Sequence, residues 1–127
     1  MPLDEADLKL MWDMLDSARR VVSYVHGVNE AQFHRDTKTQ DAVARCVEII
    51  GEAARKVSDS GRSQVPEVPW EIIVGTRHIL AHDYREVDQS KVWRIATIHT
   101  PELLEHLQRV LNASPPGPEA NKNPEEP

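Results

Sequence analysis

The sequence has little of several features that define common protein classes. It holds one cysteine, Cys46, so an intramolecular disulfide cannot form. Aromatic residues make up only 5% of the chain, so a core must be mostly aliphatic. No apolar run approaches the roughly 20 residues that cross a bilayer, and the acidic N-terminus lacks the apolar segment of a signal peptide. We therefore expect a cytoplasmic protein without a membrane partner.

Three sequence patterns are also missing. No stretch alternates apolar and polar residues as a half-buried strand does, no internal repeat occurs, and no glycine-rich phosphate loop is present. What remains is a chain of 127 residues with 39% apolar and 28% charged residues, which suits one soluble domain. The chain is thus expected to be built from helices.

The net charge of −6 lies at the two ends of the chain. The first 16 residues carry −4 and the segment from Ala113 carries −2, so Ser17 to Asn112 sums to zero. An acidic chain of this kind is not expected to coat nucleic acid non-specifically. The neutral middle still leaves room for a local basic cleft.

Apolar residues recur at helical spacing along most of the chain. The spacing predicts an all-α, up-and-down bundle of four to five helices over residues 1–112, with a disordered tail rich in proline and glutamate over residues 113–127. The expected helices run over residues 4–26, 39–58, 70–84, from 88, and up to 111. Residues 59–63 are expected to end the second of them.

Several residues mark helix ends. Asp4 and Asp88 are predicted N-caps, Asn29 to Gln32 resembles a capping box, and Gly27 is a predicted C-terminal glycine. Pro101 predicts either a kink or the first turn of a new helix.

The expected core uses one face of each helix. Phe33 is predicted to fill it from a connection, and Gly51, costly inside a helix, indicates close approach by a neighbour. Cys46 is read as a small buried apolar residue. In the segment 70–84 we expect these residues to point inward: Ile72, Ile73, Val74, Ile79 and Leu80.

The segment W-E-I-I-V-G-T-R-H-I-L-A-H-D-Y, residues 70–84, gathers most of the chain's reactive side chains. Each helical residue turns about 100°, so Arg77 and Tyr84 share a face, whereas Arg77 and His82 point roughly 140° apart. One straight helix therefore cannot aim Arg77 and His82 at a single atom. They can converge if the helix loosens near His82, or if a second copy supplies one of them.

Residue types alone leave three readings of this segment open. In the structural reading, histidine merely stabilises a helix C-terminus and Arg77 forms a surface ion pair. In the metal reading, His78 and His82 hold zinc with Asp83, although no further cysteine or histidine supports a site. In the nuclease reading, Arg77 binds phosphate and His82 moves a proton.

The run R-H-I-L-A-H-D-Y resembles the R-x4-H-x-Y signature of HepT-like toxins of the HEPN superfamily. Three further phrases resemble the same family: T-Q-D-A-V-A-R-C-V-E-I-I-G-E-A-A from Thr39, P-E-V-P-W from Pro66, and A-H-D-Y-R-E-V-D from Ala81. The resemblance covers nearly the whole chain except its tail. His78 stands where the superfamily usually has a different polar residue, often asparagine.

The resemblance implies a helical homodimer with metal-independent endoribonuclease activity and no cofactor. It also implies a toxin–antitoxin pair, in which a minimal nucleotidyltransferase antitoxin transfers AMP to the motif tyrosine, here Tyr84. The alternatives are a non-catalytic HEPN module that binds a nucleotide or a partner, and a purely structural helical dimer.

The chemistry of the residues suits a metal-free ribonuclease acting on RNA. Such an enzyme uses the RNA's own 2′-hydroxyl as nucleophile and needs a base with a pKa near 7, and an ordinary histidine has a pKa of about 6.5. It also needs a fixed cation on the phosphate, which arginine supplies. We predict that Arg77 and His82 are catalytic, that His78 and Tyr84 support them, and that Tyr84 is also the modified residue.

Overall fold

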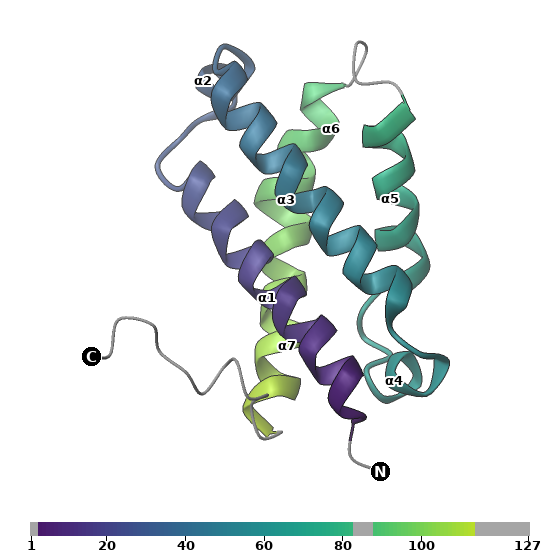
Figure 1. Cartoon of the computed structure of the whole chain (residues 1–127). Coiled ribbons are helices and arrows are strands. Elements are labelled where there is room, and N and C mark those ends of the chain that lie inside the picture. Colours follow the sequence, from purple (N-terminus) through teal and green to yellow (C-terminus); the bar gives the residue numbers. More distant parts are fainter. Residues whose placement is uncertain (1–2, 83–87, 114–127) are drawn as a thin grey trace, which may run out of the picture.

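The structure is a computed structural model, and it describes residues 3–82 and 88–113. For residues 77–79, 81, 82 and 113 it describes the helical backbone alone. Throughout these ranges the regular structure is helical, as predicted (Figure 1). The elements are α1 (Glu5–Val25), α2 (Glu30–His34), α3 (Thr37–Lys56), α4 (Asp59–Gln64), α5 (Trp70–His82), α6 (Gln89–Arg94), the π-helix η2 (Ile95–His99) and α7 (Thr100–Ala113).

Long helices form the up-and-down bundle. Helix α1 packs against α3 and α7, and α3 packs on its other side against α5. The helices α6, η2 and α7 follow one another without a break and run behind α1 and α3 (Figure 1). The short helices α2 and α4 lie at opposite ends of the bundle, where they connect the long ones (Figure 1). None of the helices within the described ranges is long and apolar enough to cross a bilayer.

The predicted helix ends are mostly confirmed. The Asp4 carboxylate accepts from the Ala6 amide, and Asp88 accepts from the Ser90 amide. Asn29 and Gln32 form the predicted capping box, with bonds of 2.8 and 2.9 Å. Gly27 has a φ of +74°, a conformation that favours glycine. The second long helix starts two residues earlier than predicted because Asp36 caps it through the Thr39 amide.

Two local predictions were wrong. Residues 59–63 do not simply end the second helix, since they lie within the separate helix α4, which Ser58 caps through the Gly61 amide. Ile72 does not point inward, since its side chain is 70% exposed. The inward stripe of α5 includes Ile73 and Val74, which are half-buried, and Leu80, which is 5% exposed, while the side chain of Ile79 lies outside the described part.

Pro101 lies in the first turn of α7, as one of the two predictions had it, although no break separates α7 from the helix before it. The helix widens into a π-turn at Ile95–His99. There the Thr100 amide and hydroxyl both donate hydrogen bonds to the Ile95 carbonyl. A proline cannot donate a hydrogen bond and crowds the preceding turn of a regular α-helix. The wider turn just before Pro101 lets the helix continue through it.

The core has two parts. One joins α1, α3 and α7 to the segment before α5, and includes Met11, Met14 and Leu107. The other surrounds Phe33, which is fully buried as predicted and packs on Trp93 with ring centroids 5.2 Å apart. Cys46 is buried as predicted, and Gly51 is buried too.

Candidate functional site

The start of α5 is tied to the end of α3. The indole Nε1 of Trp70 donates to the Val65 carbonyl at 3.0 Å. The Arg62 guanidinium lies 5.9 Å from the Trp70 ring centroid and donates to the Ala54 carbonyl at 3.1 Å. Arg62 thus satisfies a carbonyl at the C-terminus of α3 while covering the first residue of α5. These contacts fix where the helix that carries the predicted motif begins.

The rotation of α5 is set farther along by Leu80. This side chain is buried in the same part of the core as Val43 and Val47 of α3. Ile73 lies seven residues earlier, two helical turns away, and therefore on the same side of the helix. The helix remains α-helical through His82.

The backbone places three of the four predicted site residues on α5. Arg77, His78 and His82 belong to this helix, while Tyr84 lies outside the described residues. Because α5 is continuous from residue 77 to residue 82, these two positions keep their separation of roughly 140° around the helix axis. The side chains of Arg77, His78 and His82 are outside the described part, so their roles remain predictions.

A groove runs between α5 and the η2–α7 helix, and residues of α3 also line it. It has a volume of about 310 Å³. It is lined on the α5 side by Ile72, Ile73 and Thr76, on the opposite side by Ile95, His99, Thr100, Glu102, Leu103 and His106, and elsewhere by Val47, Ile50, Glu67 and Pro69. Sequence reasoning missed this groove. Its only sequence signal is His99 and His106, seven residues apart and hence on one face of the helix.

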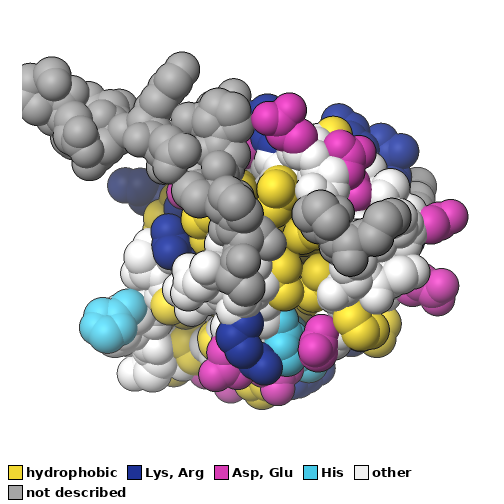
Figure 2. Space-filling model, turned by 90° about the horizontal axis from the view of Figure 1, so that it is seen from below, with side chains coloured by type: hydrophobic (Ala, Val, Ile, Leu, Met, Phe, Trp, Pro, Cys, Tyr) yellow, Lys and Arg dark blue, Asp and Glu magenta, His cyan; other side chains and the backbone are white. Residues whose placement is uncertain are grey.

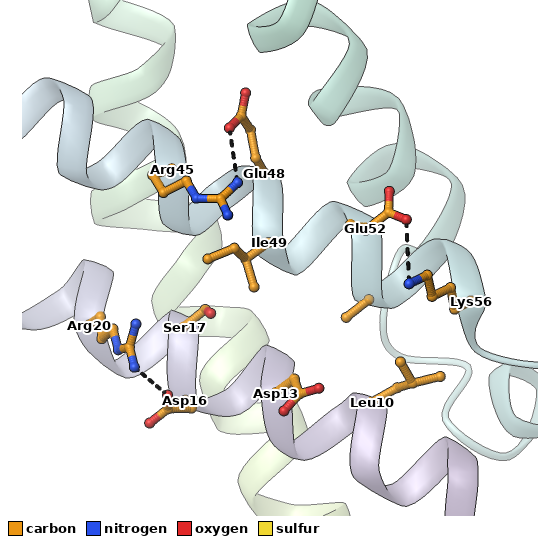
Figure 3. A pocket seen from close by; sticks show the side chains of 11 residues that line it. Leu10, Asp13, Asp16, Ser17, Arg20, Arg45, Glu48, Ile49, Glu52 and Lys56 are labelled. Carbon is orange, nitrogen blue, oxygen red and sulfur yellow. Dashed lines mark ion pairs between the residues drawn. The ribbon is translucent and has the colours of Figure 1, made fainter.

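A second cleft lies between α1 and α3 (Figure 3). Its three basic side chains each pair with an acid on their own helix. The distances are 3.1 Å for Arg20–Asp16, 3.7 Å for Lys56–Glu52 and 3.8 Å for Arg45–Glu48. Arg55 pairs with Glu52 on the same helix at 2.6 Å, and exposed pairs of this kind contribute little to stability. Basic side chains that already pair with acids bind phosphate poorly. This cleft is therefore a weaker candidate for a phosphate site than the predicted Arg77.

Charged and apolar side chains also mix on the surface. Seen from the end that carries α4, hydrophobic side chains reach the surface between acidic and basic ones (Figure 2). Ile72 and Ile98 are the most exposed of the large apolar side chains that the structure describes, at 70% and 49%.

Among the described residues, the Cys46 thiol and the Asp36 carboxyl have shifted pKa values. Burial raises the pKa of the Cys46 thiol, which is 3% exposed, so this thiol is not an activated nucleophile. Hydrogen bonds from the Thr39 hydroxyl and amide lower the pKa of Asp36 below its ordinary value of 3.8. Both groups thus serve the fold. No cluster of three potential metal ligands occurs among the described residues, but the zinc reading rests on side chains outside them.

The family model of HepT-like ribonucleases matches residues 14–110. The chain belongs to this family. "Putative RNase MJ1380" of Methanocaldococcus jannaschii is 32% identical over 109 residues, which are 85% of this chain and 100% of that protein. "Probable ribonuclease HepT" of Thermococcus cleftensis is 31% identical over 91 residues, or 72% of this chain and 83% of that protein. No solved structure matches the chain significantly.

Proposed function

We propose that this HepT-like chain is a metal-independent endoribonuclease that acts as the toxin of a toxin–antitoxin pair. The observation that carries the proposal is the family match over residues 14–110, with relatives whose names describe ribonucleases. The matched region includes all of α5, the helix that carries Arg77 and His82. No cofactor is needed for the chemistry that these residue types can perform.

The reaction is cleavage by the RNA's own 2′-hydroxyl. His82 takes the proton from this hydroxyl, and the 2′-oxygen attacks the adjacent phosphorus while the bond from phosphorus to the 5′-oxygen breaks. The leaving 5′-oxygen takes a proton from protonated His82 or from water, which gives a 5′-hydroxyl end and a 2′,3′-cyclic phosphate. Arg77 holds the phosphate and offsets the charge that develops on its oxygens. His78 or Tyr84 orients the phosphate or His82.

The active form is a homodimer. On an unbroken α5, Arg77 and His82 start from positions roughly 140° apart around the helix, so one chain does not aim both at the same phosphate. Of the two ways to bring them together, the continuous helix favours a second copy over loosening before His82. A two-fold interface beside α5 would place the two copies of the motif on opposite sides of one shared active site.

The toxin is regulated by a minimal nucleotidyltransferase antitoxin that AMPylates Tyr84. Tyr84 follows Arg77 by seven residues, so on a continued helix the two would share a face. The phosphate of an attached AMP would pair with Arg77 in the place that RNA needs. The added group would also fill the site by its bulk.

Expression of wild type beside His82→Ala in a host cell tests the proposal. Wild type is expected to arrest growth and to generate new 5′-hydroxyl RNA ends, which sequencing of such ends detects. His82→Ala should do neither at the same protein level. Arrest without new 5′-hydroxyl ends would instead support the non-catalytic binding module.

A further inference from the structure

The groove between α5 and the η2–α7 helix adjoins the motif. Thr76, which lines it, directly precedes Arg77 in the chain. With a rise of about 1.5 Å per residue, Ile73 in the groove lies about 6 Å along the helix axis from Arg77 and about 14 Å from His82. A ligand in the groove would therefore lie beside Arg77, the proposed phosphate-binding residue, toward the N-terminal end of α5.

The lining of this groove suits a flat, partly apolar ligand. Its walls come from Ile73, Ile95 and Leu103, and the exposed Ile72 stands at its edge. The polar lining residues are two threonines, two histidines and two glutamates, of which both glutamates are exposed and stand at the rim. A volume of about 310 Å³ lies at the lower end of the range for small-molecule sites.

The two acidic residues of the lining disfavour a phosphate in this groove. Among its described lining residues are the acids Glu67 and Glu102 but no lysine or arginine. Carboxylates repel phosphate, whereas they accept hydrogen bonds from the amino groups of nucleobases. The groove and Arg77 therefore offer complementary chemistry for the two halves of a nucleotide.

We propose that this groove binds one unpaired RNA base that carries an exocyclic amino group, next to the phosphate held by Arg77. The inference rests on the proposed ribonuclease function and adds a substrate subsite to it. The apolar walls cover the faces of the base, and Glu102 or Glu67 accepts from its amino group. Single-stranded RNA is the form whose bases are free to enter such a site.

A second copy of the chain fits the groove less well. A two-fold contact through this groove would bring the acidic rim of one copy, with Glu67 and Glu102, close to the same rim of the other. Like charges that face each other across an interface oppose association. The base avoids this repulsion because its amino group is a donor.

Binding of an RNA analogue that cannot be cleaved tests the groove separately from catalysis. The probe is a fluorescein-labelled 2′-O-methyl oligoadenylate, titrated by fluorescence anisotropy against the whole chain. Thr76→Trp fills the groove and is expected to weaken binding at least about fivefold. Ser23→Trp is the matched control, because the Ser23 hydroxyl donates to a backbone carbonyl of its own helix as that of Thr76 does. It should bind as wild type does.

Glu102→Ala and Glu67→Ala test the preference for an amino group without touching α5. Wild type should bind 2′-O-methyl oligoadenylate more tightly than oligouridylate, and at least one of the two substitutions should reduce this ratio at least about threefold. Unchanged ratios in both variants, or unchanged binding by a folded Thr76→Trp, would overturn the groove assignment. So would a drop from dimer to monomer mass in Thr76→Trp alone, since the second copy would then be the occupant. Failure to cleave ordinary RNA, with these binding differences intact, would refute the ribonuclease proposal and not the base site.

Discussion

The carboxylate of Asp7 and the N-cap residue Ser58 form a buried hydrogen-bonded pair between segments 51 residues apart. Asp7 accepts from the Ser58 amide at 3.0 Å and from its hydroxyl at 2.5 Å, and it is 3% exposed. The same hydroxyl accepts from the Gly61 amide at 3.0 Å. This pair joins α1 to α4, the short helix that precedes the loop into α5. It thereby helps to fix the start of the helix that carries the motif.

The close packing at Gly61 gives a first prediction. A Cβ atom added there would lie 2.5 Å from an Asp7 carboxylate oxygen and 2.8 Å from its Cγ. We expect Gly61→Ala to lower the free energy of unfolding by about 1–3 kcal/mol, because the buried pair must shift. Urea denaturation followed by circular dichroism measures this change.

Gly75→Ala is the matched control for Gly61→Ala. It also lies within a helix, but a Cβ atom there would have no neighbour within 4 Å. Alanine is favoured over glycine in a helix by up to about 1 kcal/mol, so this variant should be as stable as wild type or more so. Equal effects of the two substitutions on the free energy of unfolding would show that the Asp7 contact is not what makes a side chain at position 61 costly.

Asp36 gives a prediction for pH. Its pKa is lowered in the folded chain by hydrogen bonds from Thr39, so its ionised form stabilises the fold. This contribution is present above the ordinary pKa of 3.8 and is lost as the pH falls below it. We expect Asp36→Asn to be less stable than wild type at pH 7, with the difference shrinking as the pH falls below about 4. A difference that stays constant over this range would mean that the charge is not the cause.

Mixing variant chains tests whether the site is shared. Arg77→Ala and His82→Ala are each expected to be inactive, and a mixture of the two should regain part of the activity. In a two-fold dimer, one mixed site keeps an intact arginine from one chain and an intact histidine from the other. No recovery despite exchange of subunits, or full activity of a monomer in light scattering, would argue against a shared site.

Tyr84 gives a prediction for regulation. Co-expression with the proposed nucleotidyltransferase antitoxin should add one or more AMP groups to wild type, which intact-mass analysis detects, and should silence it without unfolding. Tyr84→Phe lacks the acceptor hydroxyl and should remain unmodified and toxic. An unshifted mass on wild type that the partner still inhibits would point to neutralisation by binding alone.

The sequence predicted the helices well because their signals are local. Asp4, Asp88 and the Asn29–Gln32 box are caps that short patterns specify, and Phe33 was recognisable as the only phenylalanine. Helix α4 was missed because its stability depends on Asp7, which is distant in sequence. The exposure of Ile72 could not be predicted either, since an apolar residue beside an inward stripe has the same local pattern whether buried or not.

The candidate site, too, could be predicted from the sequence only in part. The order of Arg77, His78 and His82 along one helix followed from spacing alone, and the backbone confirms that they share α5. The groove beside them could not be predicted, because it lies between α5 and the η2–α7 helix, which meet only in the folded bundle. Its residues, among them Thr76 and Glu102, come from segments that carry no common motif.

The most direct test of the ribonuclease proposal is cleavage of a defined RNA by the purified chain in excess EDTA, with mass spectrometry of the products. We expect a 2′,3′-cyclic phosphate and a 5′-hydroxyl end, and no cleavage of the same sequence in DNA, which has no 2′-hydroxyl. Arg77→Ala and His82→Ala should lose at least about 100-fold in rate while their helical circular dichroism spectra stay unchanged. Loss of wild-type activity in EDTA would contradict the metal-free mechanism, and undiminished cleavage by folded His82→Ala would contradict the assigned site.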